Sequence, residues 1–65
     1  MVYTLDVYCR RNGVSQDAGT EFIKELKDDT QALSELHKSL AWLGRFYDEV
    51  YYTLKRSDGV VVAKS

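Results

Sequence analysis

The residues that most often carry enzyme or metal chemistry are few in this sequence. His37 is the only histidine and Cys9 the only cysteine, so the chain cannot build a structural zinc site or an intrachain disulfide. A catalytic histidine needs a nucleophile or a second carboxylate nearby, and a metal-binding histidine needs further ligands. His37 directly follows Leu36, at the border of an apolar stripe. We therefore expect His37 to lie at the surface or at the border of a helix. Cys9 is expected to pack as a small apolar side chain.

The carboxylates and the glycines also lack the spacing of a reactive site. Asp48 and Glu49 are adjacent at the start of an expected strand, where successive side chains point to opposite faces. Asp28 and Asp29 precede an expected helix and are explained by capping. The four glycines are scattered and form no phosphate-binding loop. The sequence thus predicts a protein that is not an enzyme, with no catalytic, cofactor-binding or metal-binding residues, no cofactor and no small-molecule substrate.

Tyrosine and the basic residues are the remaining side chains with binding chemistry. The chain has five tyrosines, and tyrosine is frequent in protein interfaces because it combines apolar area with a polar tip. Basic residues could also gather around Tyr8 and Tyr51 at one rim of a sheet, as a surface that stacks nucleic-acid bases. These basic residues are Arg10, Arg11, Arg45, Lys55 and Arg56. The expected partner-binding residues are Tyr8, Arg10, Tyr47, Tyr51, Lys55, Val60 and Val62.

Size and charge limit the possible functions. Sixty-five residues predict one domain, 1–65, that buries only about 60% of the surface exposed by its unfolded chain, so dense packing or association must supplement its stability. Nine basic and ten acidic residues give a formal net charge of −1, which attracts neither nucleic acid nor an anionic membrane. No apolar run approaches the about 20 residues of a membrane span, and the first residues do not have the pattern of a signal peptide. We expect a cytoplasmic location and no membrane partner.

The N-terminal half is expected to form a strand and then a helix. Apolar and polar residues alternate over residues 2–10, which predicts a strand that is buried on one face. Asn12-Gly13 is a turn signal, but we do not expect it to close a hairpin, because the next residues follow a helical pattern. That pattern predicts a helix over 16–28, with an apolar stripe in Phe22–Leu26.

The middle of the chain gives the clearest helical signal. Four leucines recur at helical spacing and predict a second helix over 30–43. Asp28 and Gln31 have the spacing of a capping box. Gly44 stands where a left-handed C-terminal cap belongs.

The C-terminal segment is expected to form a hairpin over 49–64. β-branched and aromatic residues flank Asp58-Gly59, which predicts a two-residue type I′ turn. In that register Leu54 lies opposite Ala63, and Arg56 lies opposite Val61. A change of one residue in the loop would exchange the two faces of the last strand.

These elements predict a two-layer α+β domain of order β-α-α-β-β, in which two helices pack on one face of a three-stranded, mainly antiparallel sheet. The expected core comprises Tyr3, Leu5, Val7, Cys9, Phe22, Ile23, Leu26, Leu33, Leu36, Leu40, Leu43, Val50, Tyr52, Leu54, Val61 and Ala63. The other face of the sheet stays open, with Thr4, Asp6, Tyr8, Arg10, Tyr51, Thr53, Lys55, Val60 and Val62. Two tyrosines and two valines make that face unusually apolar.

The element order is similar to the start of the RelE-type ribosome-dependent toxin folds. The stretch Glu21-Phe22-Ile23-Lys24-Glu25-Leu26 looks like the first-helix pattern of that group, and residues 50–63 look like its strand hairpin. Those toxins continue through a further strand with basic and aromatic residues for RNA cleavage, which has no counterpart here. The resemblance therefore assigns neither a catalytic residue nor a family.

The leading functional hypothesis is a small non-enzymatic protein-binding module. It would occupy a partner's surface stoichiometrically, as a phage-type inhibitor or an antitoxin-like regulator of a host protein does, or form a homodimer through the open sheet face. The alternative is a nucleic-acid-binding domain that uses the basic-aromatic sheet surface. The acidic first helical stretch is a second possible protein-binding face.

Overall fold

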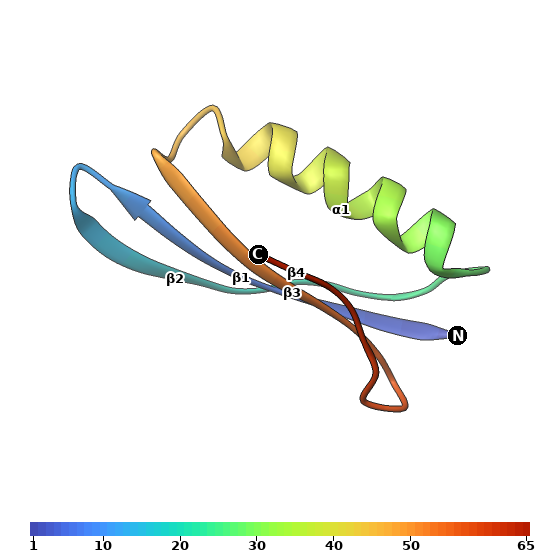
Figure 1. Ribbon diagram of the computed structural model, residues 1–65. Helices are drawn as coiled ribbons and strands as arrows, with labels where there is room; N and C mark the ends of the chain where they lie inside the picture. Colours follow the sequence, from blue (N-terminus) through green and yellow to red (C-terminus); the bar gives the residue numbers. More distant parts are fainter.

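The computed structural model describes the backbone of residues 1–65 and every side chain except those of Gln16, Asp17, Ala18 and Glu21. Its elements are strand β1 (Val2–Arg11), strand β2 (Val14–Glu25), helix α1 (Asp29–Leu43), strand β3 (Glu49–Arg56) and strand β4 (Val61–Lys64). The strands form one antiparallel sheet of order β2-β1-β3-β4, and α1 crosses one face of it (Figure 1). Two layers are present, but the predicted fold is wrong. One helix packs on four strands, where two helices on three strands were expected.

The expected helix over 16–28 is the main error, because this segment is strand β2. Asn12 (φ 53°) and Gly13 (φ 76°) both have positive φ, as a two-residue type I′ turn requires. The Asn-Gly pair therefore does close a hairpin, and β1 and β2 pair from Arg11↔Val14 to Val2↔Glu25.

Irregular pairing explains why β2 resembles a helix in the sequence. The β1–β2 register shifts between Leu5 and Asp6, and again between Val7 and Tyr8. Each shift inserts an extra residue on the bulged strand, so the apolar residues of β2 lose their period of two. Phe22 remains directed at the core, whereas Ile23 faces solvent and is 69% exposed.

Helix α1 begins with the expected cap. The Asp28 side chain accepts a hydrogen bond from the Gln31 N–H (2.9 Å), and the Gln31 side chain accepts one from the Lys27 N–H (2.7 Å). The expected left-handed C-cap is wrong, because Gly44 has φ −62°. The backbone instead continues in tight turns, and the Tyr47 N–H returns to the Leu43 carbonyl (3.1 Å).

The second hairpin is present, with a different turn. Its loop is Ser57-Asp58-Gly59, closed by the Arg56 N–H on the Val60 carbonyl and by the Gly59 N–H on the Arg56 carbonyl (both 2.9 Å). Leu54 lies opposite Ala63 as expected. A register shift between Leu54 and Lys55 places Val61 opposite Lys55 and not opposite Arg56.

The core lies between α1 and the sheet, mostly as expected. Buried residues are Tyr3, Leu5, Val7, Cys9, Leu26, Ala32, Leu36, Leu43 and Leu54. Phe22, Leu33, Leu40, Tyr47, Val50, Tyr52, Val62 and Ala63 are partly buried against them. Ile23 and Val61 (50% exposed) were wrongly assigned to the core, and Ala32 and Val62 were missed. The two valines were confused because the β3–β4 register shift exchanges their positions. No helix of the described chain is long and apolar enough to cross a membrane.

Candidate functional site

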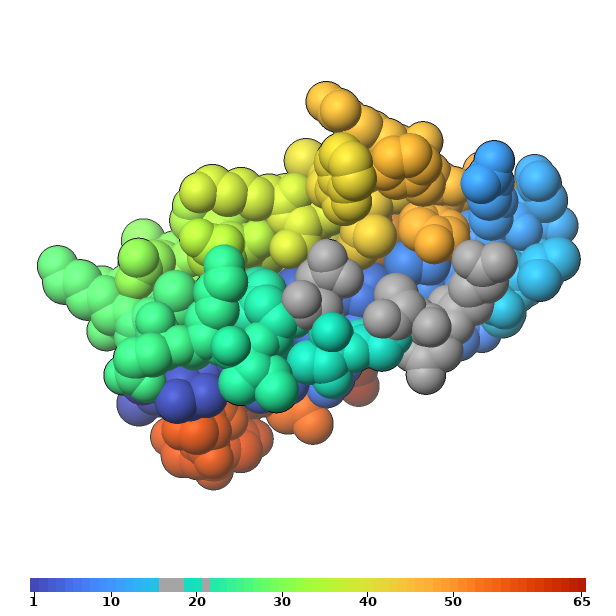
Figure 2. Space-filling view, turned by 180° about the vertical axis from the view of Figure 1, so that it is seen from behind, coloured from blue at the N-terminus to red at the C-terminus, as the bar shows by residue number. Residues whose placement is uncertain are grey.

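Among the helices and strands that the structure describes, none covers the second face of the sheet. Tyr3, Leu5 and Val7 of β1 point toward α1, and the alternate residues of β1 point away from it. We call this second surface the open face. Its residues are Thr4, Asp6, Tyr8 and Arg10 of β1; Glu49, Tyr51, Thr53 and Lys55 of β3; Ser15, Thr20 and Ile23 of β2; and Val61 and Lys64 of β4. The space-filling view shows α1 along one side of the sheet and the β3–β4 loop projecting on the other (Figure 2).

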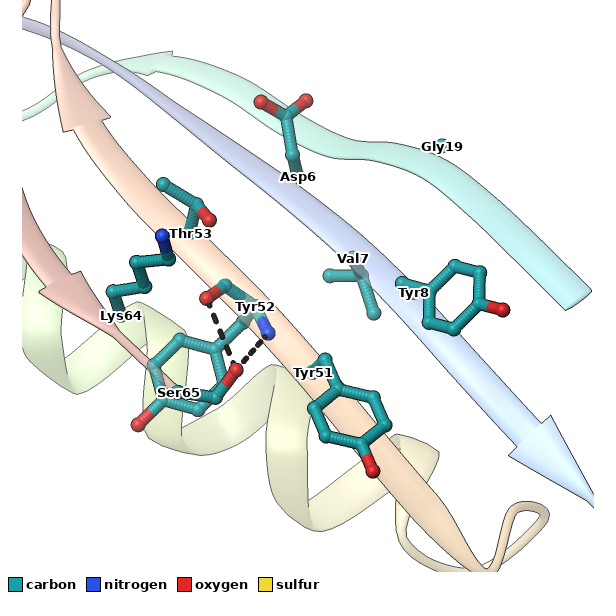
Figure 3. Close-up of a pocket in the computed structure, with 9 residues that line it drawn as sticks. All are labelled: Asp6, Val7, Tyr8, Gly19, Tyr51, Tyr52, Thr53, Lys64 and Ser65. Atoms are coloured by element: carbon teal, nitrogen blue, oxygen red, sulfur yellow. Dashed lines mark hydrogen bonds between the residues drawn. The ribbon is translucent and has the colours of Figure 1, made fainter. Parts of the chain in front are cut away.

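Two tyrosines lie near the middle of the open face. Tyr8 and Tyr51 are directly opposite each other on β1 and β3, with ring centroids 6.1 Å apart, and each is 42% exposed. Both rings stand on the same side of the sheet, beside an open depression of about 480 Å³ (Figure 3). Asp6, Thr53 and Lys64 form part of its wall. The depression is apolar at the tyrosines and polar at its other end.

Acidic groups share this face with the tyrosines. A Glu49 carboxylate oxygen accepts a hydrogen bond from the Tyr51 hydroxyl (2.7 Å) and lies 3.6 Å from Arg10 Nη1. The hydrogen bond to Glu49 and the negative charge of that carboxylate raise the pKa of Tyr51. Asp6 accepts a hydrogen bond from the Thr20 hydroxyl (3.1 Å). The face therefore offers aromatic area together with charges of both signs, which suits a polypeptide surface better than a phosphate backbone.

The structure brings together four of the seven expected partner-binding residues. Tyr8, Arg10, Tyr51 and Lys55 lie on the open face. Tyr47 and Val62 pack against the core, and Val60 (42% exposed) lies between the β3–β4 loop and the start of β4.

The expected basic rim does not form. Arg10 pairs with Glu49 at one end of β3, whereas Lys55 lies opposite Thr4 at the other end. Arg56 faces the helix side, beside Tyr3 in a depression of about 430 Å³ that also includes Asp28 and Asp29. Arg45 follows α1 and lines a different depression with Lys38, Ala41 and Trp42.

An exposed aromatic pair at the C-terminal end of α1 was missed. Trp42 (56% exposed) and Phe46 (46% exposed) form an edge-to-face contact with ring centroids 5.1 Å apart. We call it the Trp42–Phe46 pair. The pair lies outside the leucine stripe of the helix, and the pattern of core positions therefore does not include it. The i, i+4 spacing of two aromatic residues on that flank is the signal that could have revealed it.

The described side chains contain no group of histidine, cysteine, aspartate and glutamate that could hold a metal ion. His37 is exposed on α1 and Cys9 is buried in the core. Comparisons with known proteins find no match: no family model, curated protein or solved structure corresponds to this chain.

Proposed function

We propose that this protein is a small non-enzymatic protein-binding module that occupies a partner's surface through the open face. The observation that carries the proposal is the Tyr8–Tyr51 pair, exposed beside a depression on the face that α1 leaves uncovered. Tyrosine is a frequent hot-spot residue, because it buries a large rigid area and still satisfies its hydroxyl. A cytoplasmic inhibitor or regulator of a host protein works in this way, and so does a homodimer.

The charges of the open face favour a protein over a nucleic acid. A phosphate-binding surface needs several unopposed cations along one track. Here Arg10 is paired with Glu49, and Asp6 lies in the middle of the face. The basic residues of the proposed alternative point to three different parts of the molecule.

A comparison of two aromatic pairs tests the proposal. Tyr8→Ala with Tyr51→Ala should abolish association, whether with a protein captured from host lysate after nuclease treatment or with a second copy. The matched control is Trp42→Ala with Phe46→Ala, which removes two exposed aromatic rings that lie outside the open face. Circular dichroism should show that both double variants stay folded.

The two outcomes separate the faces. Loss of the complex in the tyrosine variant alone supports the open face. Loss in the Trp42–Phe46 variant alone would move the binding surface to the helix side and contradict the proposal.

A further inference from the structure

We infer that the partner of the open face is a second copy of this chain, packed face to face about a twofold axis parallel to the strands. The inference rests on the proposed function, because it uses the same face. A twofold interface is isologous: if one residue contacts another across the axis, the reciprocal contact also forms. The face must therefore be complementary to itself.

The strand order permits this symmetry. In the order β2-β1-β3-β4, an axis between β1 and β3 places β1 over β3 of the second copy and β2 over β4. Residues that share a row across the sheet then meet each other. One row across the sheet contains, in strand order, Ile23, Thr4, Lys55 and Val61. Ile23 and Val61 are the outer residues of this row. The axis sets Ile23 on Val61 of the second copy, and these are the two most exposed apolar side chains of the open face (69% and 50%).

The tyrosine row is also self-complementary. Tyr8 and Tyr51 share a row, so the axis places each over the other tyrosine of the second copy. The depression of about 480 Å³ beside each pair provides room for the incoming rings. Four tyrosines would then form the centre of the interface, where hot-spot residues concentrate.

The charges match under the same operation. Asp6, Thr53 and Lys64 share one row with Thr20. The axis places Lys64 over Thr20 of the second copy, next to the Asp6 that is hydrogen-bonded to this threonine. In the Arg10 row, Arg10 meets Glu49. Opposite charges meet in both rows, which favours this partner and this orientation.

The available surface area and the irregular sheet edges also favour a face-to-face dimer. A standard interface takes about 800 Å² from each partner, roughly a fifth of the 4294 Å² surface of this chain. One broad side of a body with extents of 36 × 19 × 16 Å can supply most of that area. Pairing through a sheet edge is less favourable, because register shifts interrupt β2 and β4 is only four residues long.

A charge-exchange experiment tests the inference. Lys64→Glu places a carboxylate beside Asp6 of the second copy, and Asp6→Lys places an ammonium beside Lys64. Each variant alone should self-associate at least about tenfold more weakly than the parent in sedimentation equilibrium. An equimolar mixture should recover the dimer, because position 64 of each copy then meets the opposite charge at position 6 of the other copy. Ile23→Glu, at an exposed position of an edge strand, gives an independent loss of the dimer without disturbing the core.

Two results would refute the face-to-face dimer. A parent protein that stays monomeric up to about 1 mM, a concentration that detects an association of about −4 kcal/mol, would refute the inference. So would a mixture of the two charge variants that fails to recover the dimer while both remain folded by circular dichroism. If the parent is monomeric but Tyr8→Ala with Tyr51→Ala loses a captured host protein, self-association is wrong and the proposed function stands. If the captured protein is retained as well, both are wrong.

Discussion

Tyr3 joins the sheet to the helix through one side-chain hydrogen bond. Its hydroxyl donates to Asp29 Oδ1 (2.5 Å) in the first turn of α1, and the residue is 1% exposed. The hydrogen bond to Asp29, reinforced by burial and by the negative charge of that carboxylate, raises the pKa of Tyr3 from 10.0 to about 12. A carboxylate acceptor resists loss of the phenol proton, because ionisation would place two negative charges together.

This pKa predicts how stability falls at high pH. The folded state holds the Tyr3 proton more tightly than the unfolded state, so the resulting stabilisation is complete below pH 10 and is lost as the pH rises toward 12. In Tyr3→Phe, the free energy of unfolding should fall less steeply across this range. Denaturant titrations at a series of pH values measure the slope. Tyr8→Phe, which leaves the bond to Asp29 intact, should keep the parent slope. An unchanged slope in Tyr3→Phe would show that Tyr3 is not the residue responsible.

Some side chains of the open face could be placed from the sequence, and others could not. Tyr8, Arg10, Tyr51 and Lys55 follow from simple alternation in β1 and β3, because both strands pair there without interruption. Val61 and Val62 could not be placed, since the register shift next to Lys55 has no signature in the residues themselves. The Trp42–Phe46 pair was not predicted, because only the apolar residues expected in the core were assigned a position on the helix.

At the scale of elements, strands with a regular period were predictable and the irregular strand was not. The pattern over β1, the leucines of α1 and the alternation along β3 all keep the period of their structure. Strand β2 changes register twice within 12 residues, so Phe22 and Ile23 look like adjacent members of a helical stripe. The decisive local signal was Asn12-Gly13, whose turn chemistry outweighed the apparent helical pattern that follows.

The two hairpins therefore depend on glycines in the left-handed region. Gly13 has φ 76° and Gly59 has φ 91°. Gly13→Val and Gly59→Val should each cost about 1–2 kcal/mol, because a side chain disfavours this conformation. Asp58→Asn should be nearly neutral, since its side-chain oxygen can still accept the hydrogen bond from the Val60 N–H. Chemical denaturation compares the three variants. Equal stability of Gly13→Val and the parent would place the first turn elsewhere.

At the scale of the whole molecule, the fold is a thin body with a core on one side of its sheet. Helix α1 covers the face that carries Tyr3, Leu5 and Leu54, and no described element covers the face that carries Tyr8 and Tyr51 (Figure 1). A chain of 65 residues with one cysteine has no disulfide to supplement this core. Association through the uncovered face would supply additional burial, so binding and stability should be linked in this protein.

That linkage predicts a melting temperature that depends on protein concentration. A partner that binds only the folded chain stabilises it by mass action, so the parent should melt at a higher temperature as its concentration rises. Tyr8→Ala with Tyr51→Ala should melt at the same temperature at every concentration, because the variant removes the centre of the interface and leaves the core intact. The Trp42→Ala and Phe46→Ala variant should keep the parent's concentration dependence, since those rings lie outside the open face. Differential scanning calorimetry over about a hundredfold range of concentration measures all three proteins. A partner present at about 100 times its Kd stabilises the folded chain by about 2.7 kcal/mol. A parent that melts at one temperature throughout would separate stability from association and remove the second copy as the partner of the open face.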